Sequence, residues 1–212
     1  MKPGLFITLE GPEGSGKTSH IEPLTRWLEG QGRQVLPTRE PGGTPISEQI
    51  RAVIHDLKNQ EMHPHTETLL YQAARAQIVE QVIRPSLAQG TIVLCDRYAD
   101  STLAYQGYGH QQDLDEVRAL IRYATGGLQP DLTLLLDVDP ETGLKRSTQR
   151  RSKGGEWNRL DAYELSFHQR VRGGYLELVK ADPGRWVVVD ADQPWGQVQS
   201  ALRKAITDKL NS

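Results

Sequence analysis

The chain has a single cysteine, no long apolar run and no excess of charge of either sign. With Cys95 as its only cysteine it cannot form an intrachain disulfide, so nothing indicates an oxidising compartment. The apolar stretch 5–9 is too short for a signal peptide and is followed by Glu10, and no stretch approaches the roughly 20 apolar residues of a transmembrane helix. We therefore expect a cytoplasmic protein without a membrane-spanning segment.

The balance of charges excludes further classes of protein. Among 212 residues, Lys and Arg number 25 and Asp and Glu number 27. A general nucleic-acid or membrane-surface binder would carry a net positive charge, so we expect neither kind of partner. No internal repeat, low-complexity segment or Ser/Gly linker divides the sequence, and we expect residues 1–212 to form a single domain.

Short apolar runs alternate with longer segments of helical periodicity. The runs at 5–9, 34–38, 91–95, 132–138 and 186–189 predict buried strands. The clearest helix covers 66–87, where Pro85 is expected to kink or shorten it. This alternation predicts an α/β fold with a parallel sheet covered by helices on both faces, whose ligands bind beyond the carboxyl ends of the strands.

The first strand end carries the strongest motif. The pattern G-x-x-x-x-G-K-[ST] follows it directly, as Gly11, Pro12, Glu13, Gly14, Ser15, Gly16, Lys17 and Thr18. The glycines allow successive N–H groups to face an anion at the start of a helix. Lys17 would reach the β- and γ-phosphates of ATP, and the Thr18 hydroxyl would bind Mg²⁺. The segment is therefore predicted to be an ATP-binding P-loop.

Two further strand ends carry polar groups suited to binding the molecule that accepts the phosphoryl group. The segment Arg39–Pro45 places a charged pair and a Pro-Gly-Gly turn after the second strand. After the third strand, Asp96 is suited to Mg²⁺ and Arg97 to phosphate oxygens. Tyr105 and Gln106 offer an aromatic surface and an amide that can recognise a base or sugar. Isolated histidines at 55, 63 and 65 lack further ligands and predict an exposed loop rather than a metal site.

These motifs together resemble the bacterial thymidylate kinases. Glu10–Thr18, Arg39–Thr44 and Asp96–Gly107 carry the resemblance, and segments 134–138 and 167–175 continue it nearly to the end of the chain. The resemblance implies a P-loop, nucleoside monophosphate kinase-like fold with a five-stranded parallel sheet. It also implies a homodimer that transfers the γ-phosphoryl group of ATP directly to dTMP with Mg²⁺, supplying dTTP synthesis.

The same resemblance implies roles for individual residues around dTMP. Tyr71, where the family usually has Phe, would stack on thymine, and Arg75 would hydrogen-bond the O4 atom of the base. Arg97 would hold the dTMP phosphate. The remaining contacts would come from Glu13 to the sugar 3′-hydroxyl, Glu40 to the acceptor or metal, and Ser101, Tyr105 and Gln106 to the base and deoxyribose. Tyr71 and Arg75 lie four residues apart, so a helix would place both on one face.

Besides Lys17 and Mg²⁺, an arginine is normally needed near the γ-phosphate. We expect a lid over the site to supply it. The interior of the P-loop holds no basic residue, whereas segment 145–159 is rich in them. A basic loop with the hinge Gly154-Gly155 would close over ATP, exclude water and deliver an arginine. By resemblance Arg150 is the closest match, and Arg151 and Arg159 remain alternatives.

Two other classes of function remain open from the sequence. One is a kinase for a different nucleoside monophosphate or small molecule on the same fold, which a substrate profile would distinguish. The other is a nucleotide-dependent switch without catalytic activity, which should lack an acceptor site. A GTPase is disfavoured because D-x-x-G and N-K-x-D are absent from the sequence.

Overall fold

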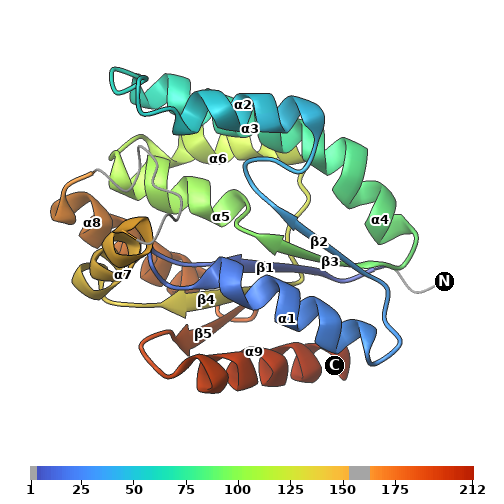
Figure 1. The fold of residues 1–212 in the computed structure, drawn as a ribbon. Helices are drawn as coiled ribbons and strands as arrows, with labels where there is room; N and C mark the ends of the chain where they lie inside the picture. The colour runs from blue at the N-terminus through green and yellow to red at the C-terminus, as the bar shows by residue number, and fades with distance from the viewer. Residues whose placement is uncertain (1–3, 153–162) are drawn as a thin grey trace.

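The computed structural model describes residues 4–152 and 163–212, apart from the side chains of residues 150 and 151. Its sheet has five parallel strands in the order β2-β3-β1-β4-β5 (Figure 1). The strands are β1 (Phe6–Glu10), β2 (Val35–Arg39), β3 (Ile92–Asp96), β4 (Leu132–Asp137) and β5 (Trp186–Asp190). All five were predicted from the sequence, and each is confirmed within a single residue at either end.

Helices cover both faces of the sheet, as predicted. On one face lie α1 (Lys17–Glu29) and α9 (Trp195–Leu210) (Figure 1). The other face is covered by the run α3 (Pro64–Ile78), η1 (Val79–Ile83) and α4 (Arg84–Ala88), by α5 (Ala99–Thr102) with η2 (Leu103–Gly109), and by α8 (Leu165–Ala181). Outside these lie α2 (Pro45–His55), α6 (Leu114–Thr125) and α7 (Pro140–Ser152). Within the described ranges, no helix is both long and apolar enough to cross a membrane.

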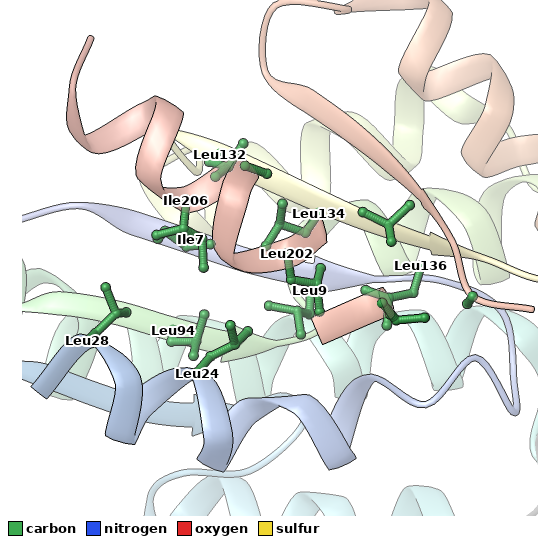
Figure 2. Packing of buried hydrophobic residues seen from close by; sticks show 14 of the residues in the cluster. Ile7, Leu9, Leu24, Leu28, Leu94, Leu132, Leu134, Leu136, Leu202 and Ile206 are labelled. Atoms are coloured by element: carbon green, nitrogen blue, oxygen red, sulfur yellow. The ribbon is translucent and has the colours of Figure 1, made fainter. Parts of the chain in front are cut away.

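The hydrophobic core forms on both faces of the sheet, because successive residues of a strand point to opposite faces. Ile7 and Leu9 point to the face under α1 and α9, where they pack with Leu134 and Leu202 (Figure 2). Phe6 points to the opposite face, against the helical run that begins with α3. Because both faces are covered, every residue of β1 is buried, which is typical of a parallel sheet.

Pro85 does not end the long helix predicted over 66–87. The chain remains helical from Pro64 to Ala88, and a π-helical segment, Val79–Ile83, directly precedes the turn that contains Pro85. Proline lacks an N–H donor, and its ring would clash with the carbonyl of Gln81 in a regular α-helical turn. The wider π-helical turn accommodates the ring, so the helix continues to the start of β3.

We predict that Leu134→Ala destabilises the fold by about 2–5 kcal/mol, because the truncation leaves a cavity in the middle of the sheet. Leu134 is fully buried between β1 and β5. Val188 on the outer strand β5 is 46% exposed, and Val188→Ala serves as the control with a cost of about 1 kcal/mol or less. Urea unfolding measures both values, and equal costs would contradict the assignment of Leu134 to the core.

Candidate active site

The carboxyl ends of β1, β2 and β3 open into a cavity of about 640 Å³. It is bounded by the start of α1, by α2, α3 and α7, and by the segment that follows β3. Most of the residues predicted for the site line it together: Glu13, Gly14, Gly16, Lys17, Thr18, Glu40, Tyr71, Arg75, Asp96, Arg97, Ser101, Tyr105 and Gln106. The structure therefore brings most of the predicted site residues together around one cavity.

The P-loop wraps around the amino group of Lys17. Lys17 Nζ donates to the carbonyls of Gly11 and Pro12 at 2.9 Å and to Ser15 Oγ at 3.0 Å, so these three residues form the inner side of the loop. Burial, together with the nearby Arg97, lowers the pKa of Lys17 to about 8. Gly11, Gly14 and Gly16 all have positive φ, which other residues rarely adopt. A Cβ on Gly14 would lie 2.0 Å from the carbonyl oxygen of Gly143, so the loop also packs directly on α7.

Thr18 and Asp96, the two residues predicted to bind Mg²⁺, are in contact. Thr18 Oγ1 donates to Asp96 Oδ2 at 2.6 Å, joining the first turn of α1 to the end of β3. Among the described residues no group of three or more His, Cys, Asp or Glu forms a metal site. A hydroxyl beside a carboxylate still fits Mg²⁺, which usually takes one or two protein oxygens and completes its shell with waters and phosphate oxygens.

Arg97 lies at the centre of a buried group of polar side chains. Arg97 Nη2 donates to Glu13 Oε1 at 2.6 Å and to the Tyr105 hydroxyl at 3.1 Å, and Tyr105 also donates to Glu13 Oε1 at 3.0 Å. Burial would raise the pKa of Glu13, but the charges of Arg97 and Lys17 and the Tyr105 hydroxyl outweigh it and lower the pKa to about 2. Glu13 is therefore ionised at neutral pH.

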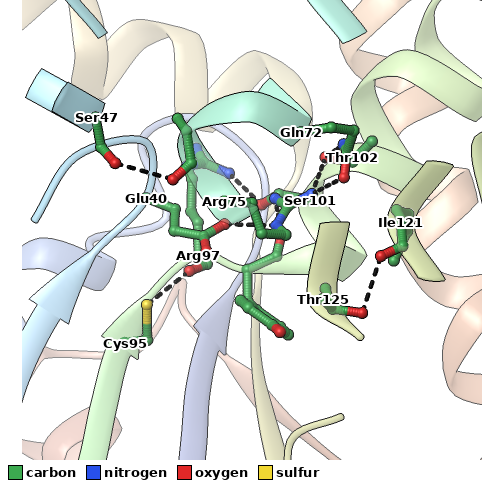
Figure 3. A network of polar contacts seen from close by, with 12 residues as sticks. Glu40, Ser47, Gln72, Arg75, Cys95, Arg97, Ser101, Thr102, Ile121 and Thr125 are labelled. Atoms are coloured by element: carbon green, nitrogen blue, oxygen red, sulfur yellow. Dashed lines mark hydrogen bonds and ion pairs between the residues drawn. The ribbon is translucent and has the colours of Figure 1, made fainter. Parts of the chain in front are cut away.

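Arg75 and Glu40 form a second buried charge pair. Arg75 Nε donates to Glu40 Oε2 at 2.7 Å, and Arg75 is only 1% exposed (Figure 3). Arg75 also donates to Gln72, to Thr102 and to the carbonyl of Tyr98, so the described partners take four of its five N–H groups. The other oxygen of Glu40 is buried without a hydrogen-bond partner among the described residues. The cavity therefore contains an N–H donor and a carboxylate acceptor for a ligand.

The side of the cavity near α3 is suited to a planar base. Tyr71 is partly exposed in the cavity, one turn before Arg75 on α3, as predicted from their spacing. Gln106 is buried, and its amide Nε2 donates to Glu67 Oε1 at 2.8 Å. A carboxylate only accepts hydrogen bonds, so Glu67 fixes the orientation of the amide and leaves Gln106 Oε1 as the remaining acceptor.

The prediction for His55 was wrong. His55 is the last residue of α2 rather than part of an exposed loop, and it lines the cavity with Arg39 and Arg51. Burial and the charge of Arg51 lower its pKa to about 3, so it is neutral there. The four-residue spacing of Arg51 and His55 on a helix was the signal that could have placed both in the site. His63 and His65 are exposed, as expected.

The predicted lid lies only partly within the described residues. Residues 145–152 form the second half of helix α7, whereas a loop had been expected. Arg146 belongs to this basic segment but was not among the predicted site residues; its side chain lines the cavity and donates to the carbonyl of Ala191 at 2.8 Å. The side chains of Arg150 and Arg151, the hinge glycines and Arg159 lie outside the described part, so the choice among the three arginines stays a prediction.

Comparison with known proteins decides the family. A model of the thymidylate kinase family matches residues 9–202. Thymidylate kinases of Roseiflexus sp. (strain RS-1) and Deinococcus radiodurans are 54% and 47% identical to the chain; the alignments cover 89% and 99% of it and 87% and 99% of the relatives. The crystal structure of thymidylate kinase from Ehrlichia chaffeensis superposes with a TM-score of 0.77 at 33% identity, covering 97% of this chain and 99% of that one. The chain belongs to the thymidylate kinase family. Its reaction is the phosphorylation of dTMP to dTDP with ATP.

Membership of the family agrees with the geometry of the cavity. A kinase of this class needs a donor site and an acceptor site that share one water-excluding space. The P-loop and the group around Arg75 line the same cavity, and Arg97 lies among the residues that line it. The resemblance drawn from the sequence motifs and the predicted five-stranded fold are both confirmed.

We predict that Glu13 makes the fold sensitive to acid. A pKa lowered from 4.5 to about 2 contributes stability that is fully present above about pH 5 and is lost as the pH falls toward 2. Glu13→Gln should therefore lower the free energy of unfolding by about 3 kcal/mol at pH 7 and by much less near pH 3. Urea unfolding at both pH values measures this. The exposed Glu61→Gln is the control, and a pH-independent cost of Glu13→Gln would contradict the prediction.

Proposed function

We propose that ATP and dTMP bind at the two ends of this cavity and that the γ-phosphoryl group passes directly between them. The observation that carries the proposal is the continuity of the cavity. It is lined at one end by Lys17 and Thr18 and at the other by Tyr71 and Arg75, and Arg97 also lines it. Phosphoryl transfer depends mostly on positioning and on neutralising negative charge, and the cavity supplies groups for both.

At the donor end, the N–H groups of the P-loop and Lys17 hold the phosphates of ATP. Thr18 Oγ1 and Asp96 Oδ2 lie within 2.6 Å of each other and would hold Mg²⁺. When bound, Mg²⁺ supplies positive charge to the phosphate oxygens. Lys17 Nζ, bonded to carbonyls of the loop, is already placed at the centre of the anion site.

At the acceptor end, the phosphate of dTMP takes the place of Glu13 on Arg97 Nη2. Arg97 and Glu13 are 2.6 Å apart, and a phosphate dianion competes well for a guanidinium. The Glu13 carboxylate then becomes available to the 3′-hydroxyl of the sugar. Ser101 and Tyr105 lie beside Arg97 and form the deoxyribose side of the site.

Thymine lies between Tyr71 and the polar groups at the far wall. Arg75 donates its remaining N–H to O4 of the base, and Gln106 Oε1 accepts from the N3–H group. The unpartnered oxygen of Glu40 contributes a further acceptor. A cytosine base would lose both matches, because it carries an amino group at C4 and no hydrogen on N3.

We propose that the missing cation comes from the segment 145–159, which begins in the second half of α7. Arg146 lines the cavity, and Arg150 is the fourth residue after it in the same helix. Arg151 and Arg159 remain alternatives. The P-loop itself has no basic residue before Lys17, so an arginine from this segment would complete the charge around the γ-phosphate.

Arg150→Ala should lower kcat by about 10²-fold or more, because the arginine acts on charge that develops during transfer. The dissociation constant for dTMP should stay within about twofold, since dTMP binds at the other end of the cavity. Steady-state kinetics and calorimetric titration with dTMP measure the two quantities. Arg151→Ala and Arg159→Ala are the matched variants, and unchanged turnover of Arg150→Ala would remove Arg150 from the mechanism.

We also propose a homodimer. Leu69 and Ala73 on the long helix are exposed, and so are Ile46 and Val53 on the neighbouring α2. Exposed apolar side chains on two packed helices are typical of a subunit interface. Sedimentation equilibrium should give the mass of two chains, and the mass of one chain would contradict the dimer.

The experiment that tests the proposed site measures ADP formation from Mg-ATP with dTMP, dUMP, dCMP, dGMP, AMP, UMP or no acceptor. Turnover with dTMP should far exceed turnover with dCMP, dGMP or AMP, because the base contacts at Arg75 and Gln106 match a 4-oxo pyrimidine; the rates with dUMP and UMP, which share these groups, measure what the 5-methyl group and the deoxyribose add. Preference for another monophosphate would support the alternative kinase. Equal rates with and without an acceptor would support a switch without an acceptor site.

A further inference from the structure

Glu10 is a fully buried carboxylate to which the mechanism above gives no role. It is the last residue of β1 and lies directly before the P-loop. Its Oε1 atom accepts the backbone N–H of Tyr98 at 2.7 Å. Its Oε2 atom accepts the hydroxyls of Ser101 at 2.5 Å and of Tyr175 at 2.9 Å. Each of these three partners adjoins or contacts Arg97.

The first connection to Arg97 runs through the backbone. Arg97 has φ 68°, a left-handed conformation that is unfavourable for a residue with a side chain. The N–H of Arg97 donates to the carbonyl of Leu9 at 2.9 Å, and the Cys95 thiol donates to the carbonyl of Arg97 at 3.0 Å. The next N–H along the chain, that of Tyr98, is held by Glu10. The carboxylate thus takes the place of a strand partner at the turn that aims Arg97 into the cavity.

The second connection runs through the two hydroxyls. Ser101 Oγ and the Tyr175 oxygen lie 3.2 Å and 3.5 Å from Arg97 Nη1, which also donates to the carbonyl of Gly11 at 3.1 Å. Each hydroxyl has a single hydrogen. Burial and the charge of Asp100 raise the pKa of Glu10 to about 7, so Glu10 is mostly ionised only above that pH. The ionised carboxylate can accept both hydrogens, which leaves both hydroxyl oxygens to accept from Arg97 Nη1. The carboxylate therefore decides which way the hydroxyls point.

We propose that Glu10 is a positioning residue that holds Arg97 in the orientation required to bind the phosphate of dTMP. It acts through the Tyr98 N–H and through the hydroxyls of Ser101 and Tyr175. Nη1 stays anchored by these contacts while Nη2 exchanges Glu13 for the phosphate. The inference rests on the proposed function of Arg97 as the phosphate ligand, so its test examines Arg97 separately.

Glu10→Gln is the sharpest change because it keeps the shape and removes one acceptor. With the amide oxygen toward Tyr98, the NH₂ group faces both hydroxyls, so neither hydrogen can go to residue 10. One hydrogen can pass to the other hydroxyl, because the Ser101 and Tyr175 oxygens lie 2.9 Å apart, and the second then turns toward Arg97. With the amide reversed, the NH₂ group opposes the N–H of Tyr98. Either orientation places donor against donor in a buried site, which is costly. The glutamine variant is therefore expected to misplace Arg97 in both orientations.

Calorimetric titration with dTMP and with thymidine separates the phosphate from the rest of the ligand. Glu10→Gln should weaken dTMP binding by about tenfold or more and leave thymidine binding within about twofold. Arg97→Ala should also weaken the binding of dTMP more than the binding of thymidine. The double variant should lose no more than Arg97→Ala alone, because Glu10 acts through Arg97.

Glu67→Gln is the matched control, because it also removes a buried carboxylate but acts on the base side through Gln106. Glu67→Gln should weaken the binding of dTMP and the binding of thymidine by the same factor. Tyr175→Phe is a milder variant that keeps the test valid if Glu10→Gln does not fold; it should weaken dTMP selectively and by a smaller factor. Circular dichroism confirms that each variant is folded.

The outcomes distinguish this inference from the proposed function. Equal loss of dTMP and thymidine binding in Glu10→Gln, no loss in either, or additive losses in the double variant would overturn the positioning role. If Arg97→Ala itself shows no selective loss of dTMP, Arg97 is not the phosphate ligand, and both proposals fail. Selective loss in both single variants without additivity supports the inference.

Discussion

Several charged side chains are buried close together at one edge of the sheet, and the site depends on each of them finding hydrogen-bond or ion-pair partners there. Arg97 lies between Glu13 at 2.6 Å and the hydroxyls that Glu10 orients, while Lys17 is surrounded by carbonyls of the P-loop. A buried charge without partners costs several kcal/mol, so each group constrains the position of its neighbours. In the proposed anion site, Arg97 and Lys17 are therefore held by partners before a phosphate arrives, which would lower the reorganisation that binding and transfer require.

The parallel topology explains why these charges meet. β1, β3 and β2 are adjacent in the sheet, so their carboxyl ends bring together Glu10, Asp96 and Glu40 although they are far apart in the sequence. Glu40 continues this edge, because its N–H donates to the carbonyl of Asp96 at 3.0 Å. The second charge pair, Arg75 with Glu40, then connects α3 to the sheet. One continuous cavity with a phosphate end and a base end follows from this arrangement.

Much of this was predictable because local patterns carry the information. The short apolar runs predicted the five strands within a residue at either end, and the glycine spacing predicted a phosphate-binding loop directly after β1. The spacing of Tyr71 and Arg75 predicted that they share a cavity. The same kind of pattern failed for His55, whose sequence neighbours resemble an exposed loop, and it gave no sign that Leu69 and Ala73 on the long helix are exposed. Periodicity identifies an apolar face but not what covers it.

The sequence by itself determined the class of fold, the order of the elements and the identity of most groups that line the cavity, because strand periodicity and phosphate-binding turns are local properties. Only the tertiary structure decided which partners each buried charge takes. The contacts of Glu10 with Ser101 and Tyr175 join residues 91 and 165 positions apart. Their geometry depends on how the strands twist and how α8 packs, and no local pattern encodes it. The orientation of Arg97 is therefore a property of the folded core.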